Sequence, residues 1–511
     1  MTGDAVRQVR AGRAIAHQAP AGTVASVRAD PSSRLPVPRR AGGPALSAPG
    51  RPAALARPGA GTPDRSARRL WAWWLVSRAV LVTLVVTDQA FGMQQSVLGD
   101  LHIYAEWGRG LSRGEGMPTG DDRWQYPPGA AVVFVLPDVT HAYLGLPYRA
   151  VFVGMMVAVD AVLTAALVRR SVPAAGFWVA GLTALGPVAL ARFDLLPAAA
   201  AVAAVLALAA GRFGRAGFHL AAGALLKIWP VLLLIALSRP PLRSPGRSAS
   251  IDPPPDPPPG RPTGRFPAPS PDWLRLAAGV LCAVGGLAAL FALTGWWRDA
   301  FGFLGAQQAR GLQVEAVAAT PFVVAHMLGH GTAPGYSYGS LQFDTPLARG
   351  VATACSLTEI VVIAISALWW WGWARPPAAA DGAGRAGVLV GRTLALLLVV
   401  VVTARVLSPQ YLVWIMALVA VWIAMARPAG SGGLTVPAGG PAAPVPAGGP
   451  SWRWVALLLI CVVLSQVVYP WRYNDVVQGR IMMSLVLVVR NVGLVTVCGW
   501  AWRAAAGSRP A

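Results

Sequence analysis

Residues 393–426 read TLALLLVVVVTARVLSPQYLVWIMALVAVWIAMA, and this stretch decides the fold. Apolar runs on either side of Ser408-Pro409-Gln410 approach the roughly 20 residues that a helix needs to cross a bilayer. Arg405 is the only charged residue in the stretch. Two such runs in succession predict a pair of membrane-spanning helices joined by a short turn.

The whole chain has the same character. Of its 511 residues, 55% are hydrophobic and 13% are charged, whereas soluble domains have about 25% charged residues. A soluble fold of this size would have too little polar surface to cover itself. The composition therefore excludes a soluble enzyme and predicts an all-α polytopic membrane protein.

Hydropathy places about twelve spans, give or take two, along residues 70–502. The predicted ranges are 70–91, 128–146, 148–168, 174–191, 195–211, 216–237, 273–294, 351–373, 387–406, 409–426, 452–469 and 481–502.

The formal charge of +22 follows from Arg residues in the tails and between the apolar runs. Excess positive charge marks cytoplasmic loops, so the charge does not predict nucleic-acid binding. Residues 1–69 are rich in Arg, Pro and Ala, and we expect a disordered cytoplasmic tail. The remaining cytoplasmic segments predicted are the Pro-rich linkers 238–272 and 427–451 and the tail 503–511.

This topology puts loops 92–127 and 295–350 on the extracytoplasmic side of the membrane. The four cysteines lie inside apolar runs with no Cys-x-x-Cys spacing, which predicts neither a zinc site nor a disulfide framework.

The first of these loops contains GDLHIYAEWGRGLSRGEGMPTGDDRWQYPPGA, residues 99–130. Asp100, Tyr104 and Trp107 are spaced to share one face of a short helix at the membrane surface. A carboxylate there is suited to act as a general base on a sugar hydroxyl. The alternative is a solvated loop whose acids balance Arg109, Arg113 and Arg123.

Asp100, Tyr104, the Gly-rich stretch and Tyr126-Pro127-Pro128 together resemble the first loop of the GT-C glycosyltransferases. More closely, they resemble the family 87 mannosyltransferases that use polyprenyl-phosphate-mannose. Four further stretches resemble that family in the expected order, so the resemblance covers about residues 70–502. They are ALLKIWPVLLL (224–234), ARGLQVEAV (309–317), SPQYLVW (408–414) and QVVYPWRY (466–473).

The sequence departs from the family pattern at three places. Ala316 stands where Ser is frequent, Ile228-Trp229 replaces a Pro-aromatic pair, and Met117-Pro118-Thr119 stands where Pro-Tyr is common. These departures bear on the choice of acceptor more than on the class of reaction.

The resemblance implies a GT-C-like fold and transfer of a hexose, most naturally mannose, from a polyprenyl-phosphate donor. The acceptor would be a glycolipid or glycan on the extracytoplasmic face of the plasma membrane. Asp100 would be the base of an inverting displacement, with Tyr104 and Tyr126 among the donor-binding residues. We expect no cofactor and no metal, because the leaving polyprenyl phosphate is already a stable anion. Partners are the lipid-linked donor, the acceptor and membrane lipids, with no nucleic acid.

Lys227, the only lysine of the chain, is costly inside an apolar run unless it pairs or reaches the interface. It is expected to contact a lipid phosphate or an intramembrane carboxylate, or else to extend toward the cytoplasmic end of its span. Arg192 and Asp194 are expected to form a local pair.

Arg310 is suited to clamp the donor phosphate. Glu315 would hold Arg310 or bind sugar hydroxyls, and His326 would assist the phosphate or the base. The alternatives are a surface Arg310–Glu315 pair and a buried, hydrogen-bonded histidine. Gln410 and Tyr411 begin a helix whose N-terminus suits an anionic head group, although Ser-Pro is also an ordinary helix start.

Two other functions stay open. A transporter or lipid-sugar flippase would spread polar residues through the membrane midplane and show an internal repeat, and we find no repeat. A GT-C enzyme that uses another donor sugar, such as arabinofuranose, fits the same motifs.

Overall fold

The computed structural model describes residues 65–88, 97–119, 124–237, 271–308, 310–337, 339–372, 382–426 and 450–506. These residues belong to one compact unit, Thr62–Ala511. Most of the predicted tail 1–69 and of the linkers 238–272 and 427–451 lies outside the described residues, as do residues 507–511. Residues 65–69, which we expected in the tail, already belong to the first helix.

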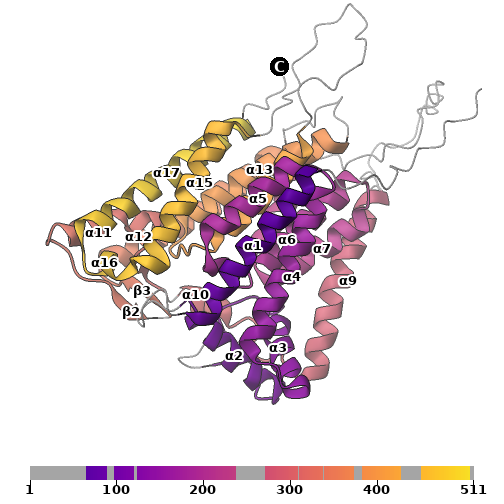
Figure 1. The fold of residues 1–511 in the computed structure, drawn as a ribbon, viewed down its shortest axis with the longest axis horizontal. Coiled ribbons are helices and arrows are strands. Elements are labelled where there is room, and N and C mark those ends of the chain that lie inside the picture. Colours follow the sequence, from indigo (N-terminus) through magenta and orange to yellow (C-terminus); the bar gives the residue numbers. More distant parts are fainter. Residues whose placement is uncertain are drawn as a thin grey trace, which may run out of the picture. The chain divides into compact units, whose positions relative to one another are not determined.

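The described residues are predominantly helical (Figure 1). The α-helices are α1 (Arg65–Thr87), α2 (Gly99–Ser112), α3 (Ala130–Leu144), α4 (Tyr148–Val168), α5 (Val172–Leu185), α6 (Leu195–Ala209), α7 (Phe213–Leu226), α8 (Leu232–Ala236), α9 (Pro271–Thr294), α10 (Phe303–Gln308), α11 (Thr320–Met327), α12 (Pro346–Gly372), α13 (Gly382–Thr403), α14 (Tyr411–Met425), α15 (Trp452–Gln466), α16 (Tyr473–Val477) and α17 (Ile481–Ala506). Short helical turns are η3 (Pro187–Ala189), η4 (Trp229–Val231), η5 (Val317–Ala319) and η6 (Val467–Trp471).

Each of the twelve predicted ranges contains a helix. Among the described residues, seven helices are long and apolar enough to cross a membrane, namely α1, α4, α9, α12, α13, α15 continued through η6, and α17. Helices α3, α5, α6 and α14 are apolar but shorter. The structure is therefore that of a polytopic membrane protein, and the count of twelve spans stays a prediction.

The predicted span 216–237 is wrong as a single helix. Helix α7 ends at Leu226, because Lys227 adopts an extended backbone conformation. Pro230 then lies in the η4 turn before the short helix α8. The break places Lys227 at a helix end, where its side chain reaches partners from other elements.

The fold is also not entirely helical. The predicted loop 295–350 contains a small antiparallel sheet in the order β1-β3-β2, formed by β1 (Leu312–Gln313), β2 (Gly335–Ser337) and β3 (Ser340–Phe343). In its register, Leu312 lies opposite Phe343. The sheet holds the segment that leads into Glu315, since the Val314 amide donates to the Leu341 carbonyl.

The core of the unit forms around α14, which packs against α5, α6 and α13. Almost every side chain of α14 is buried, from Leu412 to Val421. A helix that is apolar on all sides is stable only when it is surrounded, and the sequence of α14 is apolar throughout.

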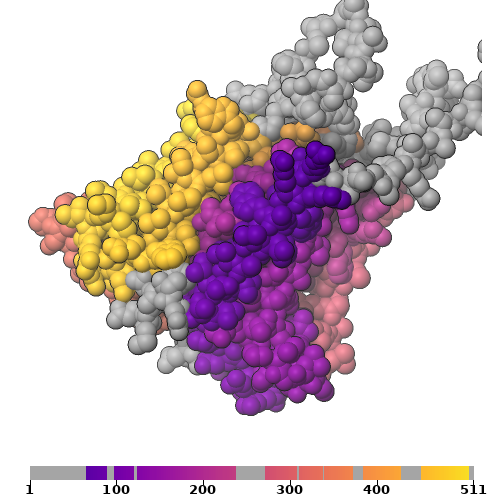
Figure 2. All heavy atoms as spheres, viewed as in Figure 1, coloured from indigo at the N-terminus to yellow at the C-terminus, as the bar shows by residue number. Residues whose placement is uncertain are grey.

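Helices at the periphery expose apolar side chains instead. Figure 2 shows α1 and α17 on one face of the molecule. Val76 and Val80 of α1 are exposed, as are Val489 and Val492 of α17. Exposed apolar side chains on long apolar helices are expected where a helix contacts lipid.

Candidate functional site

Four charged side chains from separate segments meet near the end of α7, and we call Asp100, Arg192, Asp194 and Lys227 the charge cluster. Arg192 Nε lies 2.8 Å from Asp100 Oδ2, and Lys227 Nζ lies 3.0 Å from Asp194 Oδ1. The expected local pair of Arg192 with Asp194 is therefore wrong. Each of the two pairs with a residue from another segment, because the turn before α6 presents them to different partners.

Asp100 is the accessible member of the charge cluster. Its side chain is 30% exposed, whereas that of Arg192 is 5% exposed. Arg192 is fixed by donation from Nη1 to the carbonyl oxygen of Val97 at 3.0 Å and by a hydrogen bond with Tyr469. The result is an accessible carboxylate held in place by a buried guanidinium.

Helix α2 carries Asp100 on its first turn and packs closely against α3. A Cβ at Gly108 would overlap the carbonyl oxygen of Phe134, so only glycine permits this approach of the two backbones. Tyr104 and Trp107, expected on the same face as Asp100, are buried. This face of α2 is therefore turned into the protein.

Tyr104 stacks on Phe134 with ring centroids 4.3 Å apart, and its hydroxyl lies 3.2 Å from that of Tyr126. Burial raises the pKa of both hydroxyls well above the ordinary value for tyrosine, and the Asp100 charge raises each further. Both tyrosines therefore stay protonated. Tyr104 is 1% exposed, so it supports the site from within.

Tyr126 is positioned by the turn before α3. The Gly129 amide donates to the Leu225 carbonyl at 2.9 Å, and a Cβ at Gly129 would lie 2.7 Å from the same oxygen. This contact joins the Tyr126-Pro127-Pro128 segment to the end of α7. Tyr126 and Lys227 are thereby brought together from separate parts of the chain.

Lys227 lies inside an aromatic cage formed by Tyr126, Phe193, Tyr411 and Trp414. Its Nζ lies 4.8 to 5.6 Å from the four ring centroids, a range at which a cation is attracted to an aromatic face. Of the alternatives for Lys227, the structure shows the contact with a carboxylate.

Asp194 is the buried counterpart of Lys227. It accepts a hydrogen bond from Trp414 Nε1 at 2.7 Å. Burial raises the pKa of the Asp194 carboxyl, and the Lys227 ammonium opposes this rise. A carboxylate held in this way is suited to fixing Lys227 and the start of α6.

Gln410 and Tyr411 begin α14 beside this cage. Gln410 is 8% exposed, and Tyr411 stacks on Trp414 with ring centroids 4.3 Å apart. Arg310 is near enough to interact electrostatically with the Tyr411 hydroxyl. The structure thus groups Asp100, Tyr104, Tyr126, Lys227, Arg310 and Tyr411 of the predicted residues around one region.

Glu315 does not pair with Arg310, and this expectation is corrected. Arg490 Nη2 of α17 lies 3.3 Å from Glu315 Oε2, and both side chains are 2% exposed. Burial raises the pKa of Glu315 to about 7, although Arg490 lowers it. Because the pair is buried, it joins α17 to the segment between β1 and η5.

His326 lies at the end of α11, where its Nε2 is 3.0 Å from the carbonyl oxygen of Val477. Gly479 packs against the same ring. This is the buried, hydrogen-bonded histidine that we gave as the alternative. In Figure 1 α11 lies well apart from α2, so His326 is not grouped with Asp100.

Sequence reasoning missed three contributors to the site: Arg192 as the partner of Asp100, Asp194 as the partner of Lys227, and Trp414. A signal was present, because charged residues between apolar runs must face protein or water. The sequence could not indicate which opposite charge each one meets.

Residues 124–244 match the profile of glycosyltransferase family 87. The matched segment carries Tyr126 and three of the four residues of the charge cluster, and a GT-C membrane enzyme fits the helical architecture. No curated protein and no solved structure matches the chain. The match to this family indicates a membrane glycosyltransferase.

Proposed function

We propose that the protein transfers mannose from a polyprenyl-phosphate donor to a hydroxyl group of a glycolipid or glycan, with inversion at the anomeric carbon. The observation that carries this proposal is the Asp100 carboxylate, which is partly exposed and held by the buried Arg192. It lies beside the segment that matches a glycosyltransferase family.

Asp100 takes the proton of the acceptor hydroxyl in this reaction. The hydroxyl oxygen forms a bond to the anomeric carbon while the bond from that carbon to the phosphate oxygen breaks. Polyprenyl phosphate leaves with the electron pair, so a β-linked donor gives an α-linked product. Ion pairing with Arg192 orients Asp100, which favours the ionised form that accepts a proton.

The departing phosphate gains negative charge, which Arg310 is suited to stabilise. Its proximity to Tyr411 supports a place beside the aromatic cage. Lys227 is held by Asp194 and the cage, so we assign it first to shaping the site and to the local positive potential. The site faces the extracytoplasmic side, with the N-terminus in the cytoplasm and the chain in the plasma membrane.

The experiment that tests the proposed function offers three labelled donors to membranes that contain the full chain. They are polyprenyl-phosphate-mannose, polyprenyl-phosphate-arabinofuranose and a nucleotide-mannose, each with a lipid extract as the acceptor source. We expect label in the acceptor only from polyprenyl-phosphate-mannose. Transfer from the arabinofuranose donor alone would keep the reaction class and overturn the sugar.

A flippase would instead move the labelled lipid across the bilayer of reconstituted vesicles without forming a product. Translocation without transfer would therefore contradict an enzymatic role.

A further inference from the structure

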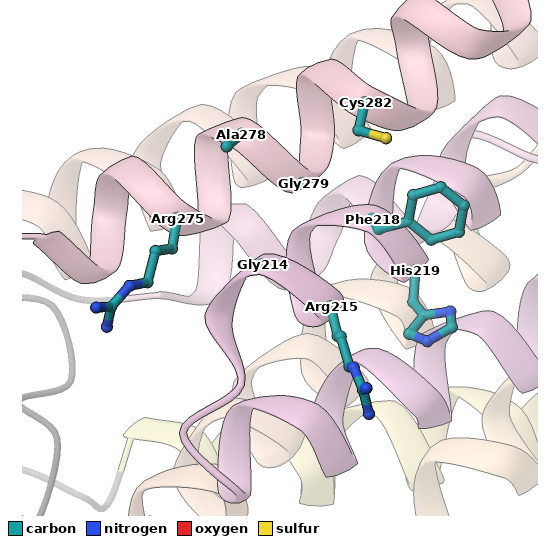
Figure 3. A pocket seen from close by; sticks show the side chains of 8 residues that line it. All are labelled: Gly214, Arg215, Phe218, His219, Arg275, Ala278, Gly279 and Cys282. Carbon is teal, nitrogen blue, oxygen red and sulfur yellow. The ribbon is translucent and has the colours of Figure 1, made fainter. Parts of the chain in front are cut away.

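A cavity of about 400 Å³ lies between α7 and α9, away from the charge cluster. Figure 3 shows Arg275 at one end of it and Phe218 and Cys282 at the other. Arg215 and His219 of α7 supply further polar groups, and Ala278 of α9 adds to the apolar lining.

Close packing of the two helices creates this cavity. A Cβ at Gly279 would overlap the carbonyl oxygen of Gly214, and one at Gly217 would overlap that of Leu276. The two backbones therefore touch directly. Larger side chains on either side of this contact, such as Phe218 and Arg215, surround the remaining space.

The cavity lies at the opposite end of α7 from the candidate site. Lys227 follows the last residue of α7, whereas the cavity is lined by residues of its first two turns. A helix of 14 residues is about 21 Å long at 1.5 Å per residue. The cavity therefore belongs to the other side of the membrane, which our topology makes the cytoplasmic side.

The surroundings of the cavity are apolar and open to lipid. Leu274 and Leu281 of α9 are 56% and 70% exposed, and Phe218 is 42% exposed. Arg275 forms an ion pair with Asp272 at 3.4 Å, but its side chain is 66% exposed. An exposed pair of this kind is weak, so the Arg275 guanidinium keeps donors available for an anion.

We propose that this cavity binds one anionic glycerophospholipid. Arg215 and Arg275 hold its phosphate, and an acyl chain lies along Phe218, Ala278 and Cys282. Basic residues next to an apolar cavity between membrane helices complement both parts of such a lipid. A zwitterionic lipid carries its own cation beside the phosphate and gains less from the two arginines. This inference does not depend on the proposed function.

The test is native mass spectrometry of the purified full chain, delipidated in detergent and titrated with phosphatidylglycerol or phosphatidylcholine of matched acyl chains. We expect one phosphatidylglycerol to bind more tightly than phosphatidylcholine. Replacing both arginines, Arg215→Gln with Arg275→Gln, should weaken phosphatidylglycerol binding roughly 30-fold, because each basic residue contributes about 1 kcal/mol. Ala278→Trp should fill the cavity and weaken the binding of both lipids.

The matched control removes two exposed arginines elsewhere, Arg169→Gln with Arg170→Gln at the end of α4, and should leave lipid binding unchanged. Equal loss in this control would mean general attraction to the basic surface and would overturn the proposal. So would unchanged phosphatidylglycerol binding in the Arg215/Arg275 variant. The intact mass and thermal midpoint of each variant separate loss of binding from loss of folding.

Discussion

At the scale of single residues, the site depends on an accessible acid held by a buried base. Asp100 is 30% exposed and Arg192 is 5% exposed, so solvent and acceptor reach the carboxylate while the guanidinium stays fixed. The second pair, Asp194 with Lys227, is more deeply buried. The exposed acid is the one placed to exchange a proton with an acceptor, and the buried pair is placed to keep its surroundings rigid.

Replacing Arg192 tests the positioning role. Arg192→Gln should lower kcat by up to about 100-fold, because misplacing a catalytic group costs on this order. The KM for the donor should change much less. Arg192→Lys keeps the charge and should recover part of kcat. A matched rise in KM with unchanged kcat would instead indicate that Arg192 binds substrate.

Glu315 predicts a pH dependence of stability. Its pKa is raised to about 7 by burial, whereas the unfolded value is 4.5. Between these values the folded chain binds more protons than the unfolded chain, so stability falls as the pH rises from 4.5 to 7. The thermal midpoint in detergent should therefore be higher at pH 5 than at pH 8, after allowance for other groups.

Glu315→Gln provides the comparison, since it cannot ionise. The difference in thermal midpoint between pH 5 and pH 8 should shrink in this variant. An unchanged difference would show that other groups cause the pH dependence.

At the scale of elements, hydropathy found the helices but not their breaks or their contacts. Each predicted range contains a helix, since an apolar run is a local property of the sequence. The end of α7 at Lys227 was missed, because an extended residue inside an apolar run is stabilised by distant partners. The pairing of Arg192 with Asp100 was missed for the same reason. The small sheet of β1, β2 and β3 has strands too short to give a pattern.

The glycine contact between α2 and α3 can be tested directly. Gly108→Ala should destabilise the protein by about 1–3 kcal/mol, because its Cβ would overlap the Phe134 carbonyl oxygen. Transfer activity should fall as well, since α2 carries Asp100. The matched control is Gly154→Ala in α4, where a Cβ meets nothing within 4 Å. Equal thermal midpoints for the two variants would contradict this account of the contact.

At the scale of the whole molecule, the account requires the two ends of α7 to lie on opposite sides of the membrane. The charge cluster lies at one end, and the turn at Arg212 precedes the other. The sequence predicted this polarity from arginine distribution alone. The motifs were recognised as an ordered series, whereas the charge cluster that unites Asp100 with the 192–227 region emerged only from the structure.

Cysteine labelling in intact cells tests the polarity. In a chain whose four native cysteines are replaced by alanine, Tyr336→Cys should react with a membrane-impermeant maleimide, since Tyr336 is 74% exposed in the predicted extracytoplasmic loop. Arg212→Cys should react only after the cells are opened. The reverse pattern would place the candidate site on the cytoplasmic side.

The central claim is that Asp100 is the base of a sugar transfer. The direct measurement compares transfer from labelled polyprenyl-phosphate-mannose by wild type, Asp100→Asn and Glu106→Gln at equal protein levels. Glu106 is an exposed acid on the same helix and serves as the matched control. We predict that Asp100→Asn lowers the rate by about 10²–10⁴-fold, as loss of a general base does, while Glu106→Gln stays near wild type. Equal rates for wild type and Asp100→Asn would contradict the account.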